Sequence, residues 1–293
     1  MGAHPLHAPV LRWYDGQARD LPWRGPERTP WGVLVSEVML QQTPVARVLP
    51  VWQEWLRRWP TPGDLAAEAS GEAVRAWGRL GYPRRALRLH EGAGQIRDRH
   101  HGQVPSAHTD LLALAGVGSY TAAAVATFGF GQRHAVVDTN VRRVLARAVS
   151  GDPLPAPSLT RAELELAESL LPDDAPTAAR WAVAVMELGA LVCTARGPRC
   201  GSCPVLDQCA WQCAGAPAYD GPARRGQAWH GTDRQVRGLM LALAREVPGP
   251  VGTTELVAAT SGTPPGQRAR ALASLVEDGL LEALGDGTYA LPG

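Results

Sequence analysis

The sequence LAGVGSYTAAA, residues 114–124, contains a Gly-x-Gly turn followed at once by an alanine-rich segment. It lies between two stretches in which apolar residues recur at helical spacing. Glycine on both sides of the valine lets the backbone turn tightly, and the N–H groups that open the next helix then point outward. Such groups bind phosphate without reading a base, so Gly116, Val117 and Gly118 are candidate contacts to a nucleic-acid backbone. A Gly-Val-Gly turn alone is weak evidence, and the rest of the chain decides its meaning.

Four cysteines stand in the spacing C-x6-C-x2-C-x5-C: Cys193, Cys200, Cys203 and Cys209. All five cysteines of the chain lie between residues 193 and 213, so no disulfide framework is expected. Four thiolates this close can instead hold one metal centre, either a structural zinc ion or a cubane iron–sulfur cluster. Zinc sites usually combine two C-x2-C pairs, whereas only Cys200 and Cys203 form one here. The spacing favours iron–sulfur over zinc, and Cys213 is expected to be a free thiol.

Glu37 lies in the segment SEVMLQQT, residues 36–43, with apolar residues on both sides of it. Because a carboxylate is costly to ionise in such surroundings, we expect its pKa to rise towards neutrality. That is the setting of a general acid. The alternative is a glutamate paired with a nearby arginine. Gln41, Gln42 and Thr43 add short polar groups at the helix end that could reach base edges.

Asp138 follows two valines and precedes a predicted helix in the segment VVDTNVRR, residues 136–143. Taken by itself, it is best explained as the N-cap of that helix. Taken with Glu37, it supplies a second carboxylate that can stay ionised beside a protonated partner. Glycoside cleavage uses this division of roles.

The first 225 residues read as mostly helical, because apolar residues recur at helical spacing throughout. The predicted helices cover residues 31–40, 45–59, 72–80, 86–97, 109–115, 120–128, 141–149, 161–170 and 178–192. Glycine and proline punctuate the gaps, and we find no strand-like alternation in this region. Residues 214–232, rich in Gly, Ala and Pro, are typical of a linker.

The tail from residue 233 onward has a different pattern. Three short helices are predicted over residues 234–245, 254–260 and 266–278. Two strands, residues 280–284 and 288–291, then flank Gly-Asp-Gly, which is a hairpin signal. Three helices followed by a two-stranded wing describe a small winged-helix-like module; the alternative is a helical cap with a frayed end.

The net charge of +1 says little, but the charge is unevenly distributed. Residues 75–147 carry eleven arginines against four acids, whereas residues 151–174 carry one arginine against six acids. The basic stretch indicates either a face for a polyanion or a solvated helical surface. The chain contains no lysine, which excludes Schiff-base catalysis by a lysine amine. No apolar run is long enough to span a bilayer, and the N-terminus lacks a secretory signal, so we expect a cytoplasmic, nucleoid-associated protein.

Together these features resemble the MutY-type adenine DNA glycosylases of the helix-hairpin-helix superfamily. The matching motifs, in chain order, are Leu21-Pro22-Trp23-Arg24, residues 36–43, Leu80-Gly81-Tyr82, residues 114–118, residues 138–147, Met186-Glu187-Leu188-Gly189-Ala190 and the cysteine spacing. The match runs from about residue 11 to residue 209. Any one motif could mislead, but together and in this order they are highly specific.

The resemblance implies an all-α core of two domains that grip DNA between them. We expect an iron–sulfur cluster domain formed by residues 1–28 and 136–213. A six-helix domain, residues 29–135, would contain the helix-hairpin-helix. The linker, residues 214–232, and the winged-helix-like α+β module, residues 233–293, would follow.

The resemblance also implies the reaction: hydrolysis of the N-glycosidic bond of an adenine mispaired with 8-oxoguanine or guanine, in base excision repair. The adenine would be flipped out of the duplex into a pocket. Glu37 would protonate the adenine at N7, and Asp138 would stabilise the oxocarbenium-like sugar, electrostatically or by transient covalent attachment. Tyr120 and Asn140 match family residues that support this centre.

Other residues match the family by position. Trp23, Arg24 and Glu187 match residues that line the adenine pocket. The residues that would wedge into the duplex or touch the bases are Leu40, Gln42, Thr43, Leu80 and Tyr82. The four cysteines would hold a 4Fe–4S cluster, and Arg143, Arg196 and Arg199 would meet DNA phosphates. The expected partner is double-stranded DNA with such a mispair, and the protein is expected to be a monomer without membrane contact.

Related proteins and one different class of function compete with this interpretation. Endonuclease III shares the hairpin, the aspartate and the cysteine spacing, but its lyase lysine corresponds to Tyr120. A thymine-mismatch glycosylase lacks the glutamate that matches Glu37. A cluster-bearing DNA-binding regulator would need neither carboxylate in its motif.

The tail departs from the family, whose well-known members carry a larger Nudix-like domain that recognises 8-oxoguanine. Only some sixty residues remain here. Selectivity for 8-oxoguanine over guanine is therefore expected to be weaker, or to come from Gln42, Thr43 and Tyr82 alone. In addition, Pro83 stands where a second tyrosine is common, so the duplex wedge is expected to differ in shape.

Overall fold

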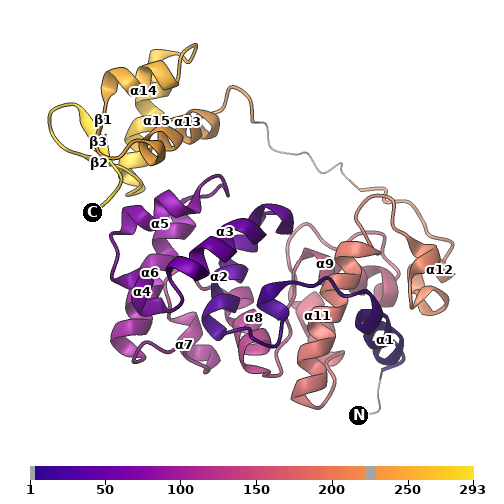
Figure 1. Ribbon diagram of the computed structural model, residues 1–293. Helices are drawn as coiled ribbons and strands as arrows, with labels where there is room; N and C mark the ends of the chain where they lie inside the picture. Colours follow the sequence, from indigo (N-terminus) through magenta and orange to yellow (C-terminus); the bar gives the residue numbers. More distant parts are fainter. Residues whose placement is uncertain (1–3, 222–228) are drawn as a thin grey trace. The chain divides into compact units, whose positions relative to one another are not determined.

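The computed structural model describes residues 4–221 and 229–293 (Figure 1). Contacts divide the chain into two compact units, each considered over its described residues. The first comprises Met1–Leu34, Ser106–Leu112 and Val117–Ala223, and the second comprises Val35–Pro105, Ala113–Gly116 and Arg224–Gly293. The expected domain bounds stay predictions, and part of the expected linker, residues 222–228, lies outside the described residues.

The helices of the first unit are α1 His7–Gln17, α7 His108–Leu112, α8 Ser119–Phe130, α9 Thr139–Leu145, α10 Arg161–Ser169, α11 Ala175–Leu191 and α12 Ala210–Cys213. Helix α11 is central, because α1, α8 and α9 all pack against it. Asp174 caps its first turn by accepting from the backbone N–H of Thr177 at 2.9 Å. Trp181 and Leu188 on α11 then fill the core between α1 and α9.

Helix α2, Pro30–Leu40, runs from the first unit into the second. The second unit continues with α3 Val45–Arg58, α4 Pro62–Ala66, α5 Ser70–Trp77 and α6 Arg84–Arg99. Trp55, Trp59 and Trp77 are fully buried there, and their rings meet edge to face with centroids 4.9 and 5.6 Å apart. This aromatic cluster fixes α3 against α5.

The C-terminal module, residues 229–293, also belongs to the second unit. Its elements are α13 Asp233–Glu246, β1 Val251–Gly252, α14 Thr253–Ala259, α15 Pro265–Glu277, β2 Glu282–Ala283 and β3 Thr288–Ala290 (Figure 1). The strands pair antiparallel in the order β1-β3-β2, with Val251 opposite Tyr289 and Glu282 opposite Ala290. Met240, Leu256 and Leu275 fill its core. The winged-helix-like architecture is confirmed, with one correction: the wing has a third strand, β1.

The all-α fold class of the core is confirmed. Each helix expected before residue 193 coincides with an observed one apart from shifts of a few residues at the ends. Periodicity missed three helices, α1, α4 and α12, and the expected helix 141–149 ends at Leu145 and continues as a π-helical turn, Ala146–Ser150. Across residues 4–221 and 229–293, every helix is too short or too polar to cross a lipid bilayer.

Candidate active site

Glu37 lies on α2 and is buried, with 6% of its surface exposed. Its neighbours Val35, Val38 and Met39 are at most 3% exposed. The buried, apolar setting expected for this glutamate is therefore confirmed. A carboxylate in such a place must keep a proton or hold a charged or hydrogen-bonding partner. Leu40, which ends the helix, is half-buried.

The residues expected to read the duplex meet where α2 ends and α6 begins. Tyr82 donates from its hydroxyl to Gln42 Oε1 at 2.9 Å, and Thr43 donates from Oγ1 to the Leu80 carbonyl at 3.3 Å. Gln42 and Tyr82 both adopt left-handed backbone angles, with φ of 54° and 46°. Tyr82 is 46% exposed, whereas the Leu80 side chain is buried. The structure thus brings all four residues together and presents Gln42 and Tyr82 to solvent.

Arg85, which the sequence did not single out, holds this arrangement. Its Nη1 donates to the carbonyls of Val38 and Gln41 at 2.8 and 2.7 Å, which satisfies the C-terminal end of α2. Its Nη2 donates to Thr43 Oγ1 and to the Gly81 carbonyl, both at 3.2 Å. Burial lowers the pKa of this guanidinium to about 10. One buried arginine therefore links the end of α2 to the loop that carries Tyr82.

Asp138 is the N-cap of α9, as its position in the sequence predicted. Its Oδ1 accepts from the backbone N–H groups of Asn140 and Val141 at 2.9 and 2.7 Å. Its Oδ2 accepts from Asn140 Nδ2 at 2.8 Å. Burial raises the pKa of Asp138, and these hydrogen bonds oppose that rise. The carboxylate is thereby held in one fixed orientation.

Arg143 extends this network towards the cysteines. Its Nη2 donates to Asn140 Oδ1 at 2.7 Å and to the Gly189 carbonyl at 2.6 Å, and its Nε donates to the Cys193 carbonyl at 2.6 Å. The residue is 8% exposed, and burial lowers the pKa of its guanidinium. The structure places Arg143 inside the protein as a support for Asn140, so its expected contact with a DNA phosphate stays a prediction.

Glu187 and Arg24, expected to line the substrate pocket, form an ion pair with Nη1 and Oε2 2.7 Å apart. A second arginine, Arg19, was missed by sequence reasoning. It donates from Nε to Oε1 at 2.6 Å and from Nη2 to Oε2 at 2.8 Å. Burial of Glu187 works to raise its pKa, but the two arginines outweigh it and hold the pKa at about 2. Trp23, in the 3-10 turn that carries Arg24, is buried.

These groups of the first unit lie along α11. Gly189 sits against Asn140 so closely that a Cβ there would come within 2.7 Å of the Asn140 Cβ. Met186 and Tyr120 pack against the same small apolar cluster, and Met186 Sδ lies 3.9 Å from Arg24 Nη2. The side of α11 around residues 186–189 therefore gathers the tyrosine, the Asp138 network and the Glu187 pair.

The Gly-Val-Gly turn has the predicted backbone. Gly116 has φ of +77°, and a Cβ there would come within 2.9 Å of Arg88 Cβ, so only glycine fits. Gly118 is the N-cap of α8, and Gly118 and Ser119 are exposed. Val117 is buried. The N-terminal end of α8 is therefore open to solvent, as a phosphate contact requires.

The four cysteines of the predicted set line one pocket together with Arg147, Val192, Leu206, Trp211 and Gln212. Arg147 Nη1 lies 3.5 Å from Cys193 Sγ, and Gln212 Nε2 lies 3.2 Å from Cys200 Sγ. Burial raises the pKa of Cys203 to about 11, so thiolates there would need a bound cation. Cys213 is exposed and does not line the pocket.

The donor set of this pocket consists of four thiols, which is the chemistry that a metal centre bound by cysteines requires. Among residues 4–221 and 229–293, no three His, Cys, Asp or Glu side chains are arranged to hold one metal ion. The space in this pocket that is free of protein atoms measures about 280 Å³, and part of it is open solvent. Arg196 and Arg199 are exposed in the loop between the first two cysteines.

Comparison with known proteins agrees with this geometry. Residues 35–169 match the family described as HhH-GPD superfamily base excision DNA repair protein. The chain is 55% identical over 285 residues to "Adenine DNA glycosylase" of Mycobacterium tuberculosis (strain CDC 1551 / Oshkosh), covering 97% of this chain and 92% of the relative. The chain belongs to the adenine DNA glycosylase family.

Two further proteins are similar to this member of the adenine DNA glycosylase family over about two thirds of its length. The Homo sapiens "Adenine DNA glycosylase" is 43% identical over 213 residues, which cover 68% of this chain and 38% of the human protein. A thermostable thymine-DNA glycosylase of known structure superposes with a TM-score of 0.62 at 29% identity, covering 70% of this chain and 93% of that chain. The HhH-GPD fold predicted from the motifs is thereby shown.

Proposed function

We propose that this chain excises adenine from DNA by hydrolysing the N-glycosidic bond, with Glu37 as the general acid and Asp138 as the anionic stabiliser of the sugar. The oriented Asp138 carboxylate is the observation that carries the proposal. Its three hydrogen-bond donors fix its direction and favour the ionised form. An ionised carboxylate lowers the energy of the positive charge that develops on the sugar as the bond breaks.

Glu37 would supply the proton. Adenine is a poor leaving group until a ring nitrogen is protonated, and N7 is the nitrogen we assign to this step. The buried position of Glu37 favours the protonated form of a carboxyl at neutral pH. Tyr120 and Asn140 would support the centre, since Asn140 orients Asp138 directly.

The adenine would be flipped out of the duplex into a pocket formed by Trp23, Arg24 and Glu187. The carboxylate of Glu187 accepts from both arginines, so its geometry is fixed before the base arrives. A pre-organised pocket avoids the cost of ordering these side chains when the substrate binds.

The mispair would be recognised at the exposed side of the second unit. The proposed substrate is adenine opposite 8-oxoguanine or guanine, and Tyr82, Gln42, Thr43, Leu80 and Leu40 would contact the bases around the opened position. The exposed Tyr82 ring is the natural wedge, because a large flat side chain can fill the space that the flipped base leaves.

The reaction would stop after glycosidic cleavage. A lyase step through a Schiff base needs an amine, and this chain has no lysine. We therefore propose a monofunctional enzyme that leaves an abasic site.

The four cysteines would hold a 4Fe–4S cluster, whose iron atoms would bind the thiolates and so fix the loop of residues 193–209. Arg196 and Arg199 on that loop, with Gly116, Val117 and Gly118 of the hairpin, would contact DNA phosphates. The enzyme would act as a monomer on nucleoid DNA.

The first test is an excision assay on duplexes with one adenine opposite 8-oxoguanine, guanine or thymine, followed by hot alkali. We expect cleavage at the adenine in the first two duplexes, and only after alkali. Glu37→Gln and Asp138→Asn should each lower the single-turnover rate at least about a hundredfold, because each removes a charge or proton that acts in the transition state.

Asparagine is a good N-cap, so Asp138→Asn should keep α9 folded and keep DNA binding. An Asp138→Asn protein that excises adenine at the wild-type rate would reduce Asp138 to a capping residue. Cleavage without alkali would contradict the monofunctional assignment.

A further inference from the structure

The loop between α5 and α6, residues 78–83, has a strained and specific shape. Gly78, Gly81 and Tyr82 have positive φ values of 53°, 78° and 46°. A tyrosine seldom adopts such angles unless its surroundings impose them. Whatever holds the two ends of this loop therefore helps to set the direction of the exposed Tyr82 ring.

The C-terminal module holds the first end of the loop through Arg245, the penultimate residue of α13. Arg245 donates from Nε to the Val74 carbonyl at 2.8 Å and from Nη1 to the Gly78 carbonyl. Both carbonyls belong to the end of α5, where helix carbonyls need outside partners. Within the described part of the chain Arg245 makes no ion pair, and burial lowers its pKa to about 10. Because burying a cation is costly unless it is hydrogen-bonded, these bonds to main-chain carbonyls indicate a specific contact between the module and α5 rather than a chance surface pair.

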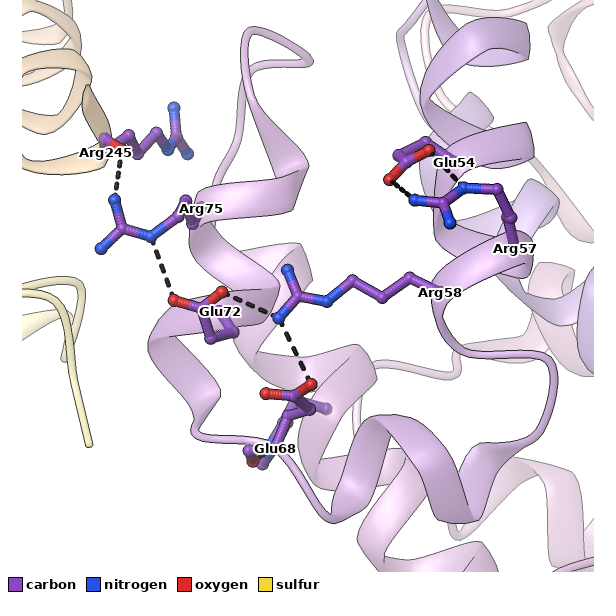
Figure 2. Close-up of polar contacts among 8 residues, drawn as sticks. Glu54, Arg57, Arg58, Glu68, Glu72, Arg75 and Arg245 are labelled. Atoms are coloured by element: carbon purple, nitrogen blue, oxygen red, sulfur yellow. Dashed lines mark hydrogen bonds and ion pairs between the residues drawn. The ribbon is translucent and has the colours of Figure 1, made fainter. Parts of the chain in front are cut away.

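The contact is reciprocal, and Figure 2 shows the half of it that Arg75 makes. Arg75 on α5 donates from Nη1 to the carbonyl of Arg245 at the end of α13, while its Nε donates to Glu72 Oε1 at 3.0 Å. Glu72 is held in turn by Arg58 at 2.9 Å. Each of the two helices thus receives a guanidinium from the other at its C-terminal end, where the helix dipole favours a cation.

The same module holds the other end of the loop through Asp278, which follows α15. Its Oδ1 lies 3.1 Å from Arg84 Nη1, and Arg84 is the first residue after the loop. Its Oδ2 lies 2.5 Å from Arg237 of α13, so the carboxylate is anchored inside the module. A third contact joins the chain end to α5, where the Gly71 N–H donates to the Pro292 carbonyl at 2.8 Å.

We infer that the C-terminal module is a specificity element: through Arg245 and Asp278 it fixes both ends of the 78–83 loop and thereby sets how Tyr82 meets the base opposite the adenine. This inference rests on the proposed function. The charge of the module agrees with an indirect role, since residues 229–293 carry five arginines against seven acids and so attract phosphates poorly. Arg245 and Asp278 are positioning residues, because both act through the loop.

The test compares two duplexes that differ only in the base opposite the adenine, 8-oxoguanine or guanine. Single-turnover excision rates are measured for full-length Arg245→Gln and Asp278→Asn, with Arg270→Gln as the matched control. Arg270 is an exposed arginine on α15 whose acidic partner, Asp233 at 3.5 Å, lies in the module itself. We expect the ratio of the two rates to fall about threefold to tenfold in both variants, the equivalent of one hydrogen bond, and to stay unchanged in the control.

A double-mutant cycle separates positioning from general stability. Tyr82→Ala should lower the same ratio, and adding Arg245→Gln to it should cause no further fall, because both changes act on one feature. Should Arg245→Gln fail to fold, Asp278→Asn still carries the test. It breaks the ion pair with Arg84, whose side chain is 55% exposed, so the core is left intact.

Two kinds of outcome overturn the inference. The first is a ratio of the rates on the 8-oxoguanine and guanine duplexes that stays unchanged in both variants, or that equals 1 in the wild type. The other is an equal fall of the rate on both duplexes, which would mean a structural role only. Either result leaves adenine excision itself intact. A wild-type protein that excises no adenine from any duplex would instead defeat the proposed function.

Discussion

At the scale of single residues, several buried arginines position irregular segments of this chain by donating to main-chain carbonyls. Arg85 donates to carbonyls at the end of α2, and Arg245 donates to carbonyls at the end of α5. Arg143 donates to the carbonyls of Gly189 and Cys193. A guanidinium offers five N–H donors in a rigid plane, so one side chain can satisfy several carbonyls of an irregular segment. A lysine ammonium has a compact, rotating set of donors and could not replace it.

Glu187 is the opposite case, a fully buried carboxylate held by two arginines. Its folded-state pKa of about 2 lies below the usual 4.5, so its contribution to stability is present above pH 4.5 and is lost as the pH falls towards 2. At pH 7 we expect Glu187→Gln to lower the free energy of unfolding by on the order of 2–3 kcal/mol, because it leaves Arg19 and Arg24 without their partner. The partial exposure of Arg19 places this loss below the ~3–5 kcal/mol expected when a fully buried pair is broken.

Urea unfolding of the wild type and Glu187→Gln between pH 7 and pH 3 measures this effect. The difference in unfolding free energy between the two proteins should narrow below pH 4.5, because the carboxylate of the unfolded wild type then takes up a proton while that of the folded protein stays ionised. Arg161→Gln, which removes an exposed pair within α10, should show no such pH-dependent difference. A constant difference across this range would contradict the assigned pKa.

At the scale of elements, the sequence predicted what periodicity and spacing can encode. The helices that face the core on one side, such as α3 and α6, were found because their apolar residues recur every three or four positions. Helix α4 was missed because its five residues are too few to show a pattern, and α1 was missed because its apolar residues form only a weak stripe. The two-residue strand β1 was missed because it gains its structure only by pairing with β3, far along the chain.

The candidate site likewise contains some residues that the sequence could predict and others that it could not. Residues in local motifs, such as Asp138 and the cysteines, could be selected from spacing alone. Arg19, Arg85 and Arg245 could not, because their partners lie 42 to 171 positions away or are backbone carbonyls, which leave no mark in the sequence. The one available signal was the total absence of lysine, which makes arginine the default buried cation.

The cysteine loop, residues 193–209, carries a prediction at this scale. Purified protein should contain about four iron atoms and four acid-labile sulfides per chain, with broad visible absorbance. Cys203→Ser should lose the iron because Cys203 lines the pocket, whereas Cys213→Ser should keep it. Metal analysis of both variants checks this. Stoichiometric zinc without iron, or equal iron loss in the two variants, would contradict the cluster or its ligand set.

At the scale of the whole molecule, the C-terminal module belongs to the same compact unit as α3–α6. The mycobacterial relative aligns over 97% of this chain, whereas the human one aligns over 68%. A module that is docked by Arg75, Arg245 and Asp278 should stabilise the helices it touches, since each contact is present only in the docked state. It should therefore behave as part of its unit rather than as a tethered domain.

Gly71 offers a way to break this docking at one backbone position. A Cβ at residue 71 would overlap the Pro292 carbonyl oxygen and come within 2.9 Å of Leu291 Cβ, so Gly71→Val must push the chain end away from α5. We expect amide hydrogen exchange to speed up about tenfold or more in α5, α13 and residues 288–293, while α9 and α11 of the other unit keep their protection. Gly94→Ala is the matched control, because a Cβ on α6 at that position meets open space and favours the helix. Unchanged exchange in α13 of Gly71→Val would show that the module does not depend on this contact, and that Arg245 and Asp278 hold it without help from the chain end.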